Sequence, residues 1–141
     1  MNLIYRCKHR ELTGGIWVKE PMIPISLNGK EGLKVNFNAI LDSGSDFVLI
    51  PLEVAEVLGL KINKRKKEQA KFYSGSTLST TQSSVTMSIS KLRNPKITFK
   101  VKCMVLLNKD QQHDEIILGS SFFEKFKIIF DYPNNRFQIK G

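Results

Sequence analysis

Apolar and polar residues alternate with period two in several segments of this chain, which is the pattern of half-buried β-strands. In residues 33–41 the apolar side chains share one face of the predicted strand: Leu33, Val35, Phe37 and Ala39. Residues 96–107 alternate more strictly, with apolar side chains at every second position from 97 to 105. Residues 22–27 are also apolar, but Pro24 interrupts them, so we expect this segment at the edge of a sheet.

The pattern changes after residue 46, where a continuous apolar run at residues 47–50 is typical of a buried strand. Pro51 suits the first turn of a helix, and Gly59 suits its C-terminal end. A strand followed by a helix is therefore predicted over residues 47–59. A second apolar segment at residues 116–126 predicts a short strand, a glycine and one or two helical turns.

Turn residues separate the predicted strands at three places: Asn28-Gly29, Ser74-Gly75-Ser76 and Pro133-Asn134-Asn135. The chain is therefore predicted to be mainly β, with one helix and a second, shorter one. Its 141 residues suit a single domain. The sequence contains no run of about 18 apolar residues, so no membrane span is predicted. The N-terminus lacks the apolar stretch of a secretory signal, so we expect a cytoplasmic protein without a membrane partner.

The two cysteines, Cys7 and Cys103, lie far apart in the sequence and form no paired motif. Two free or buried thiols are favoured over a structural disulfide in such a chain. Cys7 and His9 resemble a fragment of a metal site, but no second half accompanies them. We therefore expect neither a metal nor another cofactor.

The net charge of +9 is concentrated in residues 61–71, which contain six lysine and arginine residues. One interpretation is a patch for nucleic acid or acidic partners. The other is a solvated loop, which we favour because no aromatic residues are interleaved and no nucleic-acid-binding motif is present. Nucleic acid is therefore not an expected partner.

The segment NAILDSGSDFVLIP, residues 38–51, places a polar cluster between two apolar strands. A carboxylate at the end of a buried strand, such as Asp42, costs free energy of folding unless it is hydrogen-bonded, and it can be kept for a chemical function. Gly44 allows a tight turn that brings backbone N–H groups toward the acid. Two such carboxylates that share a proton can hydrolyse a peptide bond, because one activates water while the other protonates the carbonyl oxygen.

This segment resembles the catalytic loop of retroviral-type (retropepsin-like) aspartic proteases, in their single-domain cellular or microbial form. The resemblance extends to PLEVAEVLGL, to the YSGS flap segment, and to IILGSSFFEKFKIIFDYPNNRFQI, and so covers about residues 20–141. It implies a small closed β-barrel-like fold with one or two short helices and a flap hairpin. Three roles stay open for residues 1–20: a dimer strand, a flexible arm or a self-cleaved leader.

The resemblance also implies roles for individual residues. Asp42 would be the catalytic acid, with Ser43 and Gly44 supporting its geometry. Gly119 would lie behind the catalytic loop in the core. The substrate would be bound by six residues: Ser45, Asp46, Tyr73, Ser74, Gly75 and Ser76. Two alternatives stay open, a structural ion pair for Asp46 and a plain hairpin position for Gly75. The hydroxyl of Ser45 is also a candidate hydrogen-bond donor to the carboxylates.

The chain contains one Asp-Ser-Gly triplet, whereas the chemistry needs two carboxylates. A two-fold homodimer supplies the second Asp42 by symmetry. The sequence thus predicts a homodimeric aspartic endopeptidase that acts on peptide or protein substrates. Three alternatives stay open: a non-cleaving dimerisation or peptide-binding module of the same fold, a basic nucleic-acid-associated protein, and an Asp42 that only forms a local turn.

Overall fold

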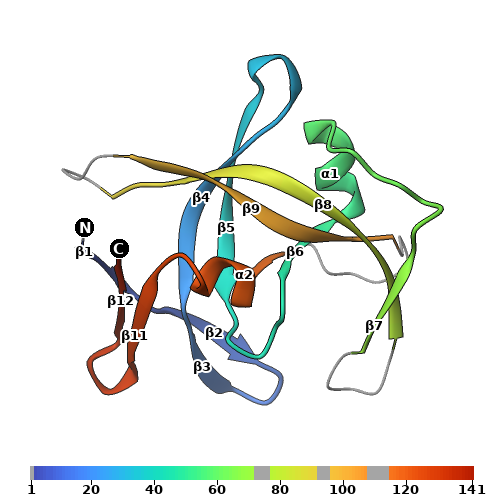
Figure 1. Cartoon of the computed structure of the whole chain (residues 1–141). Coiled ribbons are helices and arrows are strands. Elements are labelled where there is room, and N and C mark those ends of the chain that lie inside the picture. Colours follow the sequence, from blue (N-terminus) through green and yellow to red (C-terminus); the bar gives the residue numbers. More distant parts are fainter. Residues whose placement is uncertain (1, 72–76, 92–95, 108–114) are drawn as a thin grey trace.

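The computed structural model describes residues 2–71, 77–91, 96–107 and 115–141. Its main sheet contains β4 (Met22–Asn28), β5 (Lys34–Leu41), β6 (Val48–Pro51), β7 (Glu68–Lys71), β8 (Thr77–Ile89), β9 (Ile97–Leu106) and β10 (Ile116–Leu118). The strand order is β4-β5-β10-β6-β9-β8-β7, and β4 also pairs with β8. This extra pairing closes six strands into a barrel, as predicted, and Figure 1 shows β8 and β9 running across β4 and β5.

The period-two segments form strands because their apolar face can be buried inside this barrel. In β5, Ala39 is buried and Val35 and Phe37 are half-buried, whereas Leu33 before the strand is exposed. β9 follows the predicted alternation up to Cys103, after which it is buried on both faces. The apolar faces of these strands thus belong to one core cluster.

The expectation that residues 22–27 form an edge strand is wrong for their second half. β4 pairs with β5 along its whole length, and with β8 from Ile25 to Asn28. Pro24 lies just before the β8 pairing begins, where β4 has a strand on one side only. Proline has no N–H to donate, so this position tolerates it without loss of a ladder hydrogen bond.

The predicted strand and helix over residues 47–59 are confirmed as β6 and α1 (Leu52–Leu58). Pro51 is the N-cap of α1. Gly59 ends the helix with φ of 68°, a left-handed conformation that favours glycine, and its N–H bonds the carbonyls of Ala55 and Glu56. The second helix, α2 (Ser120–Phe123), follows β10 and Gly119, also as predicted.

The three predicted turns differ in length. Asn28-Gly29 begins a longer connection between β4 and β5 that contains the 3₁₀ turn η1 (Lys30–Gly32). β7 and β8 form the expected hairpin, whose tip at residues 72–76 lies outside the described residues. β11 (Lys127–Asp131) and β12 (Arg136–Lys140) flank the 3₁₀ turn η2 (Tyr132–Asn134), as the turn residues there predict.

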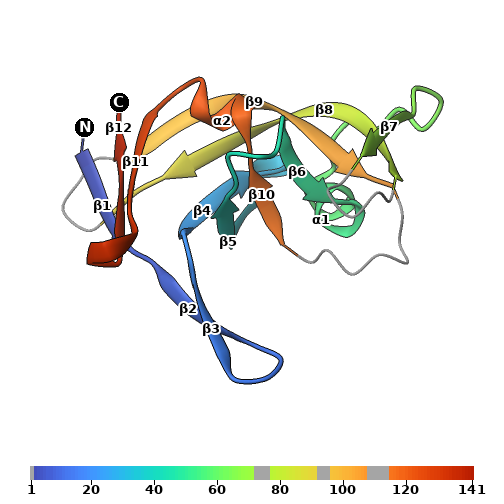
Figure 2. The same cartoon turned by 90° about the horizontal axis from the view of Figure 1, so that it is seen from below.

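Residues 2–20 form three further strands. β1 (Asn2–Arg6) pairs with β12 in the sheet β1-β12-β11, and Leu3 and Tyr5 are buried in the core. β2 (Lys8–Leu12) and β3 (Ile16–Glu20) form a separate hairpin that Figure 2 shows projecting from the rest of the chain. Trp17 on this hairpin is 62% exposed, so it is not a core aromatic.

Candidate active site

The Asp-Ser-Gly triplet lies where the chain leaves β5. β10 lies between β5 and β6, parallel to the first and antiparallel to the second. The N–H of Asp42 donates to the carbonyl of Leu118 at 3.0 Å, which continues the β5–β10 ladder by one residue. The loop from Asp42 to Phe47 is therefore held at its two ends by neighbouring strands.

One oxygen of the Asp42 carboxylate is held by the loop itself. The N–H of Gly44 donates to Oδ1 at 2.9 Å, and the N–H of Ser45 donates to the Asp42 carbonyl at 3.1 Å. Oδ2 makes no hydrogen bond to any residue that the structure describes. A Cβ at Gly44 would lie 3.3 Å from Oδ1, so the absence of a side chain makes room for the carboxylate. This arrangement is that of an Asx turn, and it orients one oxygen while the other remains open to a reactant.

The loop is exposed in the single protomer. Asp42, Ser43, Gly44, Asp46 and Phe47 are all exposed, and Ser45 between them is half-buried. A carboxylate that faces water on a surface is well solvated. The Asp42 carboxylate is therefore accessible from the surface of the chain.

Gly119 lies directly behind this loop, as expected from the sequence. A Cβ at Gly119 would lie 2.3 Å from the carbonyl oxygen of Phe47 and 2.4 Å from that of Ser45. The next N–H, of Ser120, donates to the Ser45 carbonyl at 2.8 Å. Only glycine permits this approach, so the backbone of residues 119–120 supports the loop from the core side.

Ser121 is a further support that sequence reasoning missed. Its hydroxyl accepts a hydrogen bond from the N–H of Val48 at 3.0 Å and donates one to the carbonyl of Lys102 at 3.1 Å. It thus joins α2 to the first residue of β6 and to β9. No local pattern signals this role, because the two partners lie 73 and 19 residues away in the sequence.

The predicted substrate-binding residues have different outcomes. The Ser45 hydroxyl donates to the carbonyl of Phe47 at 2.9 Å, so the expected donation to the Asp42 carboxylate is wrong in this protomer. A carbonyl two residues ahead is the nearer acceptor for a hydroxyl in a tight loop. Asp46 is exposed and forms no ion pair with any described residue. Tyr73, Ser74, Gly75 and Ser76 lie outside the described residues.

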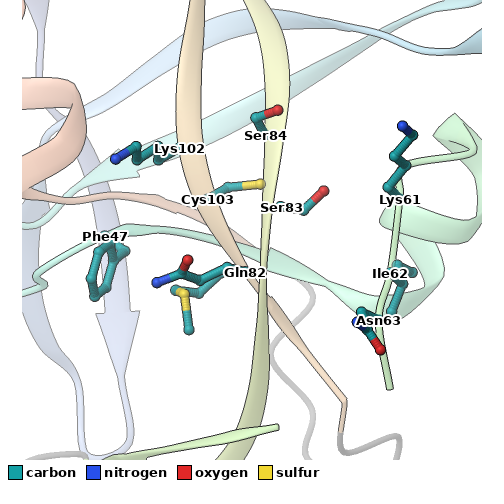
Figure 3. A pocket seen from close by; sticks show the side chains of 10 residues that line it. Phe47, Lys61, Ile62, Asn63, Gln82, Ser83, Ser84, Lys102 and Cys103 are labelled. Atoms are coloured by element: carbon teal, nitrogen blue, oxygen red, sulfur yellow. The ribbon is translucent and has the colours of Figure 1, made fainter. Parts of the chain in front are cut away.

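A cavity of about 580 Å³ begins at Phe47 and reaches across β9 and β8 to residues 61–63. Figure 3 shows Phe47, Gln82 and Lys102 on one side of these two strands and residues 61–63 on the other. Lys61, the first residue of the basic run, is therefore brought to the same cavity as Lys102, which the sequence did not indicate. The lining residues that the structure describes include two cations and no anion: Phe47, Lys61, Ile62, Asn63, Gln82, Ser83, Ser84, Lys102, Cys103 and Met104.

The cysteines are free and buried, as the sequence favoured. Burial raises the pKa of the Cys103 thiol to about 12, so Cys103 remains protonated at neutral pH and is a poor nucleophile. Among the described residues, no group of three or more histidine, cysteine and acidic side chains has the geometry of a metal site. The helices of the described chain are all too short or too polar to cross a membrane.

Comparisons with known proteins concern the family and the fold of this chain. Residues 23–122 match a family model described as aspartyl protease. Among solved structures, the chain is similar to a retropepsin-like aspartic protease from Rickettsia conorii, with 18% sequence identity and a TM-score of 0.54. That similarity covers 99% of this chain and 90% of the other, and it shows the same fold. No curated protein matches significantly.

Proposed function

Because the chain belongs to the aspartyl protease family, we propose that it is a homodimeric aspartic endopeptidase with one Asp42 from each protomer in its active site. The observation that carries this proposal is the Asp42 carboxylate on an exposed loop, with one oxygen held by Gly44 and the other without a hydrogen bond to any described residue. Because each chain holds a single Asp-Ser-Gly triplet, a two-fold axis at this loop is the simplest source of a second carboxylate.

The two Asp42 residues have complementary roles in this proposal. The ionised carboxylate takes a proton from water, whose oxygen attacks the peptide carbonyl carbon. The protonated carboxyl gives its proton to the carbonyl oxygen, and a tetrahedral diol forms. The diol then collapses, the C–N bond breaks, and the leaving nitrogen receives a proton from a carboxyl group. Ser43 and Gly44 hold the loop, while Ser45, Asp46 and residues 73–76 bind the substrate.

We expect specific activity to depend on dimer formation. Below the dimer dissociation constant, cleavage per protomer falls with dilution, because each monomer has one carboxylate. The measurement is cleavage of a peptide library at pH 4 to 7 over a concentration series, beside sedimentation of the same samples. The midpoints of the two curves should coincide. A monomer that retains full activity contradicts the shared site, and a dimer that cleaves nothing favours a non-cleaving module of the same fold.

Mixing wild type with Asp42→Asn tests the shared site directly. After subunit exchange in an equimolar mixture, about a quarter of the dimers carry two aspartates. The activity of a fixed amount of wild type then falls to about half, because mixed dimers lack one of the two carboxylates. An unchanged activity, with exchange verified by a tagged protomer, argues that each protomer acts alone.

We expect a bell-shaped dependence of kcat/KM on pH. At low pH both carboxyl groups are protonated and no base remains, and at high pH both are ionised and no acid remains. The net charge of +9 favours loss of the shared proton, so the optimum should be acidic. Ser45→Ala should leave the alkaline limb in place, because the Ser45 hydroxyl bonds Phe47. The measurement runs from pH 3 to 9 at fixed ionic strength, and activity that still rises at pH 9 excludes a shared proton.

A further inference from the structure

We infer that the side of the cavity next to Phe47 binds an acidic side chain of the substrate, of the glutamate type, and that Lys102 selects it. This inference rests on the proposed function and adds the class of substrate. Four residues form the subsite: Phe47, Gln82, Lys102 and Met104.

Strand register places these four side chains on one face of the sheet. Val48 pairs with Cys103 in parallel, so the residues before them, Phe47 and Lys102, lie side by side. Met104 pairs with Gln82 across the β8–β9 ladder. Paired residues point to the same face, and every second residue of a strand returns to it. Figure 3 shows Phe47, Gln82 and Lys102 on the same side of β8 and β9.

This face is opposite the main core. The alternate residues Val48 and Cys103 belong to the core cluster, whereas Phe47 is 37% exposed. Lys102 and Gln82 are also exposed, and Met104 beneath them is buried. The subsite therefore combines an aromatic wall and an apolar floor with one ammonium and one amide group.

The chemistry of the four side chains favours a carboxylate on an apolar stem. The methylene groups of a glutamate side chain can pack on the Phe47 ring and on Met104. Its carboxylate can then accept hydrogen bonds from the Lys102 ammonium and the Gln82 amide. None of the described residues that line the cavity is acidic, so no carboxylate of the lining competes for the Lys102 ammonium.

The subsite lies next to the loop that carries Asp42. Phe47 ends the loop that begins at Asp42, and Lys102 and Gln82 lie on β9 and β8, the next two strands of the sheet after β6. An extended peptide that lies along this loop passes over Phe47. A substrate side chain on one side of the cleaved bond therefore enters the subsite.

The test uses decapeptide pairs that differ only by glutamate or glutamine at one position, with every position scanned. Wild type should prefer glutamate about three- to fivefold in kcat/KM at a single position, as for an exposed ion pair. The preference should fall at high salt. Lys102→Gln should remove it. This variant keeps the backbone carbonyl that accepts the Ser121 hydrogen bond, so the fold should persist.

Lys100→Gln is the matched control, because Lys100 is an exposed lysine on the same face of β9 that does not line the cavity. It should retain the glutamate preference. Cleavage without a glutamate preference at any position, or a preference that Lys102→Gln leaves intact, overturns this inference but not the proposed function.

Peptide binding to the Asp42→Asn variant measures substrate selection without cleavage. Fluorescence anisotropy of the same labelled peptide pairs should give a lower Kd for the glutamate peptide, and Lys102→Gln in the same background should equalise the two values. This result would support the subsite even if the wild type cleaved no peptide. Equal affinities, or no binding of any peptide, overturn the inference.

Discussion

Asp42→Asn is expected to reduce peptide cleavage by about 10³-fold or more, because it removes the general base and the acid of the proposed pair together. The fold should survive the change. Asparagine is nearly isosteric with aspartate, and its Oδ1 can still accept the hydrogen bond from the Gly44 N–H. The thermal midpoint of the dimer should stay or rise, because two like charges at one site are removed.

The measurements are kcat/KM at the pH optimum, circular dichroism and sedimentation. Glu56→Gln is a matched control, since it also changes a carboxylate to an amide, but on the exposed face of α1. The control should cleave at the rate of wild type. If Asp42→Asn cleaves as fast as the control, Asp42 is only a turn residue.

Gly119→Ala is expected to lower the free energy of unfolding by about 3 kcal/mol or more and to abolish activity. The new Cβ would meet the carbonyl oxygens of Phe47 and Ser45 at 2.3 and 2.4 Å. Both atoms belong to the backbone, so no flexible side chain can move aside. The loop must shift, and the hydrogen bond from Ser120 to Ser45 is then lost.

Urea unfolding and peptide cleavage measure the two effects. Ser120→Ala is the neighbouring control, because it keeps the backbone and should change stability by less than about 1 kcal/mol. A Gly119→Ala protein with the stability of wild type would show that residues 119–120 do not support the loop as closely as the structure describes.

Local pattern was sufficient to predict most of the strands. The faces of β5 and β9 follow from alternation alone, since their apolar sides have one interior to fill. The strand–helix unit at residues 47–59 follows from an apolar run, from Pro51 with its restricted backbone, and from Gly59 with its permissive one. These signals lie within a few residues of the structure that they specify.

Pairings between distant segments were beyond local pattern. The closure of the barrel joins Ile25 to Ile89, and this pairing makes half of β4 an interior strand despite Pro24. The pairing of β1 with β12 joins residues 2–6 to residues 136–140. Such contacts depend on how the whole chain is arranged, which a single sequence does not reveal.

The residues of the candidate site also fall into those that local sequence identifies and those that it does not. Asp42 and Gly119 could be identified because each lies in a short motif of its own. The support from Ser121 and the position of Lys102 beside the loop could not, since both depend on neighbours on other strands. The donor role expected of Ser45 failed for a related reason, because a nearby carbonyl competes for its hydroxyl proton.

The support that Gly119 and Ser120 give to the Asp42 loop has a consequence for protein synthesis. Translation produces Asp42 early, whereas the strand and the two residues behind its loop, 116–120, are made much later. A nascent chain therefore presents the Asp-Ser-Gly triplet without the backbone that shapes it. The loop that holds Asp42 is therefore expected to reach its folded shape only after residues 116–120 have been made.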